Sequence, residues 1–578
     1  MPRAQRREAP APAGGGSNLP ADPTGRWFLG PAEAAVEARL ATWADTDANA
    51  RFWRKDPTFW PQASPEDLAG GLGWLRAPEQ SAARVGELRA FAEELTRDGI
   101  EHVVLFGMGG SSLAPEVIRR VFPPVQGRPD LSVLDSTHPA AVRACADRTP
   151  LDRTLFLVSS KSGTTLEPNV LFRFFWERVG KRSASPGGQF VAITDPGTPL
   201  ERLARERRFR TCIAAPADVG GRYSALTVFG LIPAALLGVD LEGLLGSARA
   251  MVARCADPTD GRRNPGFRLG AALGELAEAG RDKVVFLTSR SLRPLPAWIE
   301  QLVAESLGKR GRGIVPVATA PPRTELPRGS DVVFVHFTLE GEGDPALERA
   351  LDAREAGGTP VLRFELGSPL DLGREFFRWE FAVAACGSVL EVDPFDQPDV
   401  EHAKELAREA MGRQGGPVAT SPGYGTRVGP DLGPGLEGWI ATARAGDYVA
   451  VQAFLEPNDR TDAALARVAS QLRQRLSTVV TVGYGPRFLH STGQLHKGGP
   501  ASGLYLQVVD DPDQDLEVPE LGFTFGQLIR AQAKGDRGAL EQRRRRLLVV
   551  NVGSQPLEGL NALANLLGRV PPDAATRS

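Results

Sequence analysis

The sequence has few cysteines and no cluster of them. Its four cysteines, Cys145, Cys212, Cys255 and Cys386, are far apart in 578 residues, with no CxxC pair and no nearby histidine cluster. This spacing argues against disulfides and a structural zinc site, and it favours a reducing, cytoplasmic location. His490 and His496 have no carboxylate between them, so the sequence offers no metal-ligand spacing either.

Long apolar runs and a large net charge are also missing. The most apolar segment, 225–238, is too short to span a bilayer and predicts a buried core helix. The formal net charge is −2 and the pI about 6.4, which gives no bulk attraction to nucleic acid or membranes. Residues 1–25 are rich in Ala, Pro and Gly and lack hydrophobic periodicity, so we expect them to be disordered. No apolar stretch follows their arginines, so we do not expect a secretory signal.

Apolar strands alternate with amphipathic helices over much of the chain. This pattern is typical of a doubly wound parallel α/β sheet. The predicted strands of a first unit are His102–Phe106, Leu131–Leu134, Thr154–Val158, Gln189–Thr194 and Arg210–Ala214, and its predicted helices are Ser81–Thr96, Pro115–Val121, Asn169–Val179 and Pro199–Arg208.

The pattern restarts twice. A second unit has predicted strands at Lys283–Thr288, Ile314–Val317, Val332–Phe337 and Pro360–Phe364, with helices at Pro294–Leu307, Pro345–Ala356 and Leu370–Ser388. The Gly/Pro-rich segment 414–438 is interpreted as a linker or mobile loop. A C-terminal α/β segment follows it, with predicted strands Tyr448–Phe454, Ser477–Val482, Leu504–Val509 and Leu547–Val552. We therefore divide the chain at 26–275, 276–413, 414–438 and 439–578.

A hydroxyl-rich turn follows one of the first strands. Ser159–Thr165 contains Ser160, Lys161, Ser162 and Thr165 directly after the strand Thr154–Val158. Hydroxyls and backbone N–H groups at a strand-to-helix turn suit a dianionic phosphate held at a helix N-terminus. The alternative is an ordinary loop or helix cap.

A glycine-rich turn, Gly107–Ser112, follows the strand His102–Phe106. It begins like a dinucleotide-binding GxGxxG, but Ser112 replaces the third glycine and no acidic residue is placed for a ribose. The turn offers Gly110 and Ser111 to an anion at the same sheet edge as the hydroxyl-rich turn. Because no GxxxxGK[ST] is present, a small sugar phosphate is a better match than ATP.

Three further motifs carry residues suited to catalysis. Arg222 follows paired glycines, and it either holds a carboxylate structurally or stabilises an oxyanion. Gln301 and Glu305 lie near the end of a helix, where a glutamate is unfavourable to the helix dipole, so Glu305 is either a base or an exposed surface residue. Gln397 and Lys404 belong to a third motif. The alternative interpretation of this motif is the start of a helix with an ion pair on its surface.

Together these motifs resemble the glucose-6-phosphate isomerase family. Gly220–Ser224 matches one family signature, and Gly387–Lys404 matches the other, with Asp399 where a small residue is usual. The turns at 109–111 and 160–165 and the segment 305–308 are also similar to family motifs, so the resemblance covers about residues 100–405. It implies two sugar-isomerase (SIS) domains. The remainder, above all His490–Gly499, resembles the isomerase half of bifunctional transaldolase/glucose-6-phosphate isomerases. Because the isomerase motifs begin near residue 100, we expect no transaldolase barrel in this sequence.

The resemblance implies a role for each site residue. Glu305 is the base that moves the proton between C1 and C2, Arg222 stabilises the cis-enediolate, and Gln301 and Gln397 line the substrate site. The phosphate binds among Gly110, Ser111, Ser160, Lys161, Ser162 and Thr165. Lys404 matches the family's lysine. No metal or organic cofactor is needed.

The histidine that the family uses in ring opening is out of its usual order. Of the histidines between Glu305 and Lys404, His336 lies in a strand-like segment and His402 lacks the expected neighbours. His490 has the local pattern His-Ser-Thr-Gly-Gln but follows the lysine. We assign ring opening to His490, with His496 and Lys497 as rivals, and expect His102 and His138 to be structural.

The leading hypothesis is the interconversion of glucose 6-phosphate and fructose 6-phosphate. One alternative is a dual phosphoglucose/phosphomannose isomerase, and another is a non-catalytic SIS-type regulator that binds a sugar phosphate. The joint presence of Glu305, Arg222 and Lys404 argues for the enzyme. The expected partner is a small-molecule sugar phosphate, with no nucleic acid and no membrane. Members of the family commonly form dimers, so the resemblance allows a homodimer.

Overall fold

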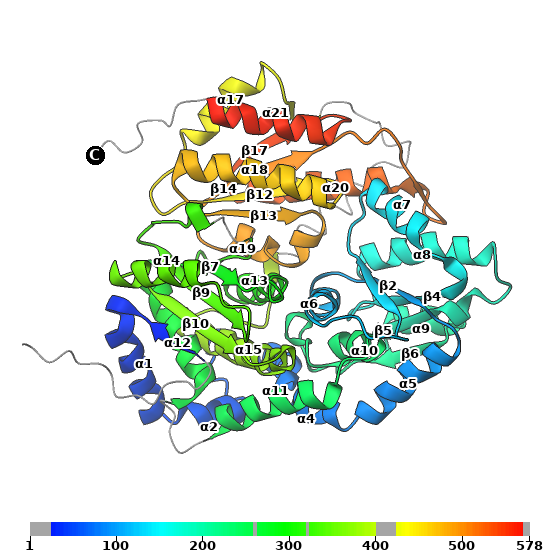
Figure 1. Ribbon diagram of the computed structural model, residues 1–578, viewed down its shortest axis with the longest axis horizontal. Helices are drawn as coiled ribbons and strands as arrows, with labels where there is room; N and C mark the ends of the chain where they lie inside the picture. Colours follow the sequence, from blue (N-terminus) through cyan, green and yellow to red (C-terminus); the bar gives the residue numbers. More distant parts are fainter. Residues whose placement is uncertain (1–24, 258–262, 320–322, 400–423, 570–578) are drawn as a thin grey trace, which may run out of the picture.

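The computed structural model describes residues 25–257, 263–319, 323–399 and 424–569. Figure 1 shows three sheets around a shared centre, with the first (cyan) on the right, the second (green) on the left and the third (orange) at the top. The helices α6 (Leu113–Val121), α13 (Leu295–Leu307) and α19 (Gly493–Gly498) lie near this centre, and α13 contacts both of the others.

The first sheet confirms the predicted parallel arrangement. Its order is β3-β2-β4-β5-β6, and every neighbouring pair is parallel. β2 and β4 are neighbours, so the glycine-rich and hydroxyl-rich turns leave the same edge side by side. The strands are β2 (His102–Phe106), β3 (Asp130–Leu134), β4 (Thr154–Ser159), β5 (Phe190–Thr194) and β6 (Thr211–Ala214).

The second sheet has the order β1-β10-β9-β7-β8, parallel except for its first strand. β1 (Trp27–Phe28) pairs antiparallel with β10, so a strand from the predicted first unit completes the second sheet. The other strands are β7 (Lys283–Thr288), β8 (Val315–Val317), β9 (Val332–Leu339) and β10 (Val361–Leu366).

The third sheet is parallel, with the order β11-β17-β14-β12-β13. Its strands are β11 (Thr426–Arg427), β12 (Tyr448–Phe454), β13 (Val480–Tyr484), β14 (Gly503–Val509) and β17 (Arg546–Asn551), and a small hairpin pairs β15 (Glu517–Val518) with β16 (Phe523–Thr524). The predicted linker 414–438 therefore contributes β11 and the start of α17 (Leu432–Ile440), whose Leu432 and Leu436 are buried in the C-terminal core. Its residues 414–423 lie outside the described part of the chain.

Helices surround the sheets. Around the first two sheets these are α1 (Glu33–Asp45), α2 (Ala48–Trp53), α3 (Pro65–Gly71), α4 (Ala77–Ala82), α5 (Val85–Arg97), α7 (Pro139–Arg148), α8 (Leu166–Gly180), α9 (Pro199–Glu206), α10 (Val228–Leu236), α11 (Leu241–Ala256), α12 (Pro265–Glu278), α14 (Pro345–Ala356) and α15 (Leu372–Val389). The C-terminal region adds α18 (Asp459–Leu476), α20 (Phe525–Gln542) and α21 (Pro556–Arg569). The helix predicted at Ser81–Thr96 is in fact two helices, because Ala83 and Arg84 separate α4 from α5.

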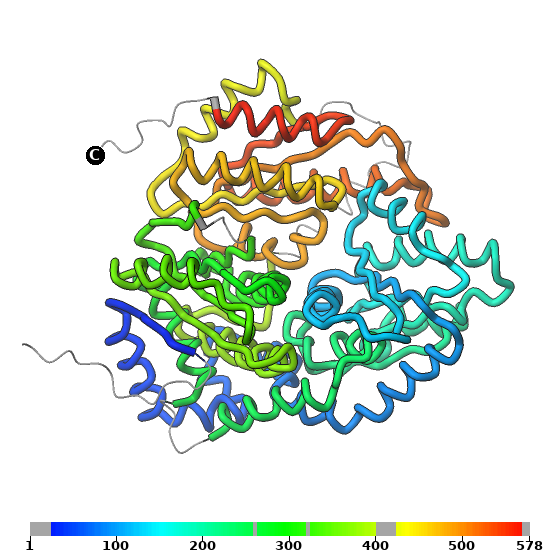
Figure 2. The backbone as a smooth tube through the Cα atoms, in the orientation of Figure 1, coloured from blue at the N-terminus to red at the C-terminus, as the bar shows by residue number. Residues whose placement is uncertain are grey.

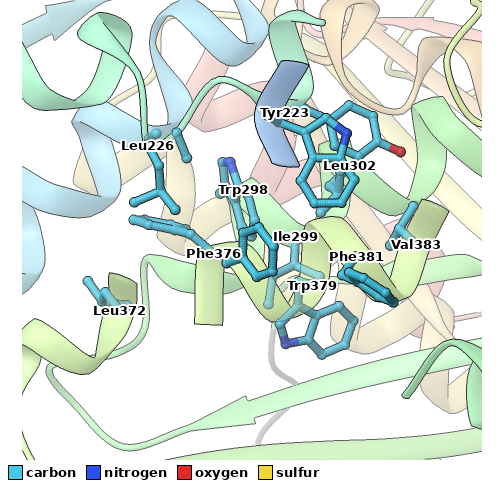
Figure 3. Packing of buried hydrophobic residues seen from close by; sticks show 14 of the residues in the cluster. Tyr223, Leu226, Trp298, Ile299, Leu302, Leu372, Phe376, Trp379, Phe381 and Val383 are labelled. Atoms are coloured by element: carbon cyan, nitrogen blue, oxygen red, sulfur yellow. The ribbon is translucent and has the colours of Figure 1, made fainter. Parts of the chain in front are cut away.

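One hydrophobic core runs continuously from the first sheet to the second. Alternate residues such as Leu105 and Leu157 on the first sheet and Phe286 and Val335 on the second belong to the same buried cluster. Figure 3 shows its centre, where α13 packs on α15 and the rings of Trp298 and Phe376 lie edge to face with centroids 4.7 Å apart. This packing fixes the helix that carries Glu305.

The C-terminal region packs against both preceding units. Tyr448 and Tyr505 of the third sheet share a core with Val285 and Phe334 of the second sheet. Phe525 at the start of α20 packs edge-on against Phe174 of α8, with ring centroids 5.7 Å apart. The backbone tube in Figure 2 shows the resulting arrangement, in which the C-terminal part adjoins both the green and the cyan regions.

Candidate functional site

Glu305 is buried at the point where the three parts of the chain meet. Glu305 is only 6% exposed, so the alternative interpretation as an exposed surface glutamate is wrong. Gln301 lies one helical turn earlier on α13, and its amide Nε2 donates to Glu305 Oε2 at 2.9 Å and to the His490 carbonyl at 2.9 Å. Gln301 Oε1 is buried and has no hydrogen-bond partner among the described residues. A ligand hydroxyl would satisfy this acceptor.

The Arg222 guanidinium is held on several sides. Its Nε donates to Ser306 Oγ at 2.8 Å, and its Nη2 donates to the carbonyls of Pro394 at 2.7 Å and Asp396 at 2.8 Å. Nη1 remains on the side of Glu305, 3.5 Å from Oε1. Because the guanidinium is fixed by neutral partners, one edge of it is available to an anionic oxygen next to the carboxylate.

The glycine-rich turn packs directly on this pair of residues. A Cβ on Gly110 would lie 1.9 Å from the Gly221 carbonyl, next to Arg222. Gly109 has φ +53°, and a Cβ there would lie 2.7 Å from both Gln301 Nε2 and the His490 carbonyl. Glycine is therefore required for close approach of the backbone at both positions.

The hydroxyl-rich turn lies beside the glycine-rich turn, as the neighbouring strands require. Ser159 Oγ donates to the Ser111 carbonyl at 3.3 Å, and Ser160 Oγ donates to Thr165 Oγ1 at 3.0 Å. Thr165 is the residue before α8, so this turn opens a long helix at its N-terminus. Ser162 is exposed and Ser160 is buried. The Lys161 ammonium is paired with Asp195, which leaves its backbone rather than its charge in the turn.

His490 reaches this region from the third sheet. It ends a short 3-10 helix after β13, and its ring is mostly buried, with Nε2 3.0 Å from Glu167 Oε1. Glu167 lies in the first turn of α8, directly after the hydroxyl-rich turn. A carboxylate partner for Nε2 leaves Nδ1 as the basic nitrogen of a neutral ring.

The two rivals of His490 have other partners. His496 is buried, Gln452 Nε2 lies 3.1 Å from its Nδ1, and desolvation holds its pKa well below the usual range. Lys497 is buried in an ion pair with Asp536, with 2.6 Å between Nζ and Oδ1. Both side chains therefore complete the packing of α19.

The loop that holds Arg222 carries a buried ionic group of its own. Lys309 Nζ lies 2.6 Å from Asp396 Oδ1 and donates to the carbonyls of Asp393 and Asp396. Burial lowers the pKa of Lys309 to about 8 and raises the pKa of Asp393 to about 6. Gln397, predicted to bind substrate, is half-buried in this loop. Lys404 lies outside the described residues.

Three further histidines have structural partners, whereas His402 lies outside the described residues. His336 Nδ1 is 2.9 Å from Glu348, and His138 Nε2 is 3.1 Å from Asp510 Oδ2 in a buried pair. His102 is paired with Asp130 at the edge of the sheet. These contacts match the structural roles expected for all three residues.

Sequence reasoning missed three residues of the site: Glu167, Ser306 and Lys309. Glu167 was the hardest to find, because an acidic residue in the first turn of a helix is ordinary. Ser306 lies within the matched segment 305–308 and Lys309 directly follows it, and that position was a usable signal.

Among the described residues, no group of three His, Cys, Asp or Glu side chains is placed to hold a metal ion. No helix within the described ranges has the length and apolarity needed to cross a membrane.

The chain is similar in sequence to known phosphoglucose isomerases. A sequence model described as phosphoglucose isomerase matches residues 84–317. A glucose-6-phosphate isomerase of Rubrobacter xylanophilus is 30% identical over 393 residues, which cover 59% of this chain and 90% of that protein. The corresponding protein of Symbiobacterium thermophilum is 30% identical over 398 residues, covering 60% and 88%.

Solved structures show the same fold. A glucose-6-phosphate isomerase from Chlamydia trachomatis superposes with a TM-score of 0.53 at 19% identity, over 66% of this chain and 86% of that one. A hypothetical protein from Thermus thermophilus gives a TM-score of 0.58 at 26% identity, over 68% of this chain and all of the other.

Proposed function

The chain belongs to the glucose-6-phosphate isomerase family, and we propose that the site around Glu305 and Arg222 carries out its reaction. The reaction interconverts glucose 6-phosphate and fructose 6-phosphate. The observation that carries the assignment is the buried pair of a carboxylate and a fixed guanidinium 3.5 Å apart. The comparisons do not favour the dual isomerase or the non-catalytic regulator.

In the proposed mechanism, Glu305 transfers a proton between C1 and C2 of the open-chain sugar. A positioned carboxylate base contributes about 10²–10⁴-fold to such a step. Arg222 Nη1 faces the same space, so it would donate to the oxygens of the cis-enediolate as negative charge develops. Its other donors are already used by Ser306 and the 394–396 loop, which means that the guanidinium does not have to reorganise.

The phosphate would bind at the N-terminus of α8, among Ser111, Ser160, Ser162 and Thr165. A dianion at a helix N-terminus is favoured by the free N–H groups and the helix dipole. Binding there would hold C1 and C2 against Glu305. Gln301 supports this placement, because its buried Oε1 has no partner within the described ranges and a sugar hydroxyl would supply one.

His490 is proposed to open the sugar ring, with Glu167 orienting its imidazole. Lys404 keeps the role that the resemblance implies, as the family's lysine. A cytoplasmic location fits four cysteines of which none forms a disulfide. We propose no nucleic acid or membrane partner, and a homodimer remains compatible with the site.

A coupled assay tests the function. Purified protein is given fructose 6-phosphate, and glucose 6-phosphate formation is recorded in the presence of a chelator, with mannose 6-phosphate in a parallel reaction. We expect conversion of fructose 6-phosphate alone. Turnover of mannose 6-phosphate would point to the dual isomerase. Saturable sugar-phosphate binding without turnover would support the regulator.

A further inference from the structure

A buried glutamine from the C-terminal region contacts the carboxylate that orients His490. Gln532 of α20 is 4% exposed, and its Nε2 donates to Glu167 Oε1 at 2.7 Å. The same oxygen lies 3.0 Å from His490 Nε2. One carboxylate oxygen therefore binds both the imidazole and the amide.

The orientation of this amide is set by a second contact. Thr137 Oγ1 donates to Gln532 Oε1 at 2.8 Å, and Thr137 is fully buried. Turning the amide over would place its carbonyl against the Glu167 carboxylate and its NH₂ against the hydroxyl. Two lone pairs would then face each other in a buried site, which is costly.

The helix that carries Gln532 is itself well fixed. Thr524 and Gln527 form a capping box at the start of α20, and Phe525 is completely buried against α8. One turn after Gln532, Asp536 pairs with Lys497 of α19, close in sequence to His490. The inward face of α20 thus contacts both the carboxylate partner of His490 and the segment that follows His490.

We propose that Gln532 is a positioning residue for ring opening: it holds Glu167 Oε1 where His490 Nε2 can donate to it. Opening the ring of fructose 6-phosphate breaks the C2–O5 bond. One proton leaves the anomeric hydroxyl and one is delivered to O5, so the orientation of the imidazole decides the rate of this step. This inference rests on the proposed function. It adds a residue from α20, far along the chain from Glu167.

The prediction separates ring opening from proton transfer at C1 and C2. In 5-deoxyfructose 6-phosphate no hydroxyl can close a five- or six-membered ring, so this ketose reaches Glu305 without ring opening. For Gln532→Leu we expect kcat/KM for fructose 6-phosphate to fall about tenfold, because a hydrogen bond to a charged group is lost. We expect kcat/KM for the 5-deoxy ketose to stay within about twofold of wild type, since Glu305 and Arg222 are untouched.

A matched control removes an equally buried glutamine of the same region. Gln507 of β14 is fully buried, accepts from Tyr424 Oη at 2.6 Å and donates to the Ala533 carbonyl at 3.2 Å, without touching Glu167. Gln507→Leu should change kcat/KM for the two ketoses by the same factor. Thr137→Val is a milder change. It should lower kcat/KM for fructose 6-phosphate about threefold and leave kcat/KM for the 5-deoxy ketose unchanged.

Thermal unfolding of each variant is measured in parallel. If Gln532→Leu does not fold, the kinetics of Thr137→Val decide whether Gln532 has the positioning role. Equal slowing of both ketoses in the deciding variant, or no slowing of either, would overturn the positioning role. Failure of the wild-type protein to isomerise either ketose would overturn the proposed function, and the positioning role with it.

Discussion

At the scale of single residues, helix α13 carries two glutamates in different surroundings. Glu305 faces Arg222, whereas burial raises the pKa of Glu300 to about 8, so Glu300 is mostly protonated at pH 7. An amide closely imitates a protonated carboxyl group, but it cannot act as a base. These two residues therefore offer a matched pair of Glu→Gln substitutions.

For Glu305→Gln we expect kcat to fall by about 10²–10⁴-fold, the usual contribution of a general base. Binding of the sugar phosphate, measured by calorimetry, should change little because the phosphate turn is intact. Glu300→Gln should keep its activity. Near-wild-type turnover in Glu305→Gln would remove Glu305 as the base.

The ring-opening assignment makes a second prediction at this scale. His490→Ala should lower kcat/KM for fructose 6-phosphate by about 10²-fold, the lower part of the range for acid–base catalysis. The same variant should convert 5-deoxyfructose 6-phosphate at nearly the wild-type rate. If both ketoses slow by the same factor, His490 has no specific role in opening the ring.

The resemblance to the glucose-6-phosphate isomerase family was enough to propose Glu305, Arg222 and His490, but not Glu167, whereas residue types alone left the roles of Glu305 and Arg222 undecided. His490 was found out of order because the residues after it, up to Gln494, match a local pattern. Nothing local distinguishes Glu167 from any glutamate in the first turn of a helix. Its partners His490 and Gln532 lie 323 and 365 residues away in the chain, so only the folded structure reveals its role.

At the scale of secondary structure elements, the strands were predicted more accurately than the connections. Parallel strands buried on both faces give continuous apolar runs, so their ends differ from the prediction by only a few residues. The Gly/Pro-rich segment before the third sheet was misjudged in its second half. Leu432, Leu436, Trp439 and Ile440 recur at helical spacing there, and they form the buried face of α17. Turn composition outweighed this periodicity in the prediction.

The contact between two turns can be tested at this scale. Gly110→Ala places a methyl group 1.9 Å from the Gly221 carbonyl, so the glycine-rich turn and the Arg222 turn must separate. A displacement of about 1 Å at a catalytic group costs on the order of 10²-fold in rate, and we expect kcat/KM to fall by that amount. Gly86→Ala is the control, because a Cβ there meets nothing within 4 Å. A fully active Gly110→Ala would show that the turns adjust freely.

At the scale of the whole molecule, the described site residues come from distant parts of a single chain. Glu167 belongs to the first sheet's unit, Glu305 to the second, and His490 and Gln532 to the C-terminal region. The C-terminal region is held in place by buried contacts with both units, including the His138–Asp510 pair. Within the single chain, His490 and Glu305 therefore lie in one site, joined through Gln301.

This arrangement predicts that two inactive variants cannot rescue each other. Glu305→Gln and His490→Ala proteins are co-expressed with different tags, mixed oligomers are isolated, and turnover of fructose 6-phosphate is measured. If His490 acted on the partner's site, a mixed dimer would carry one intact site of two, restoring about half of wild-type activity. Because the structure pairs both residues within one chain, we expect only the average of the two variants' own low activities. Recovery toward half would show that chains exchange the segment carrying His490.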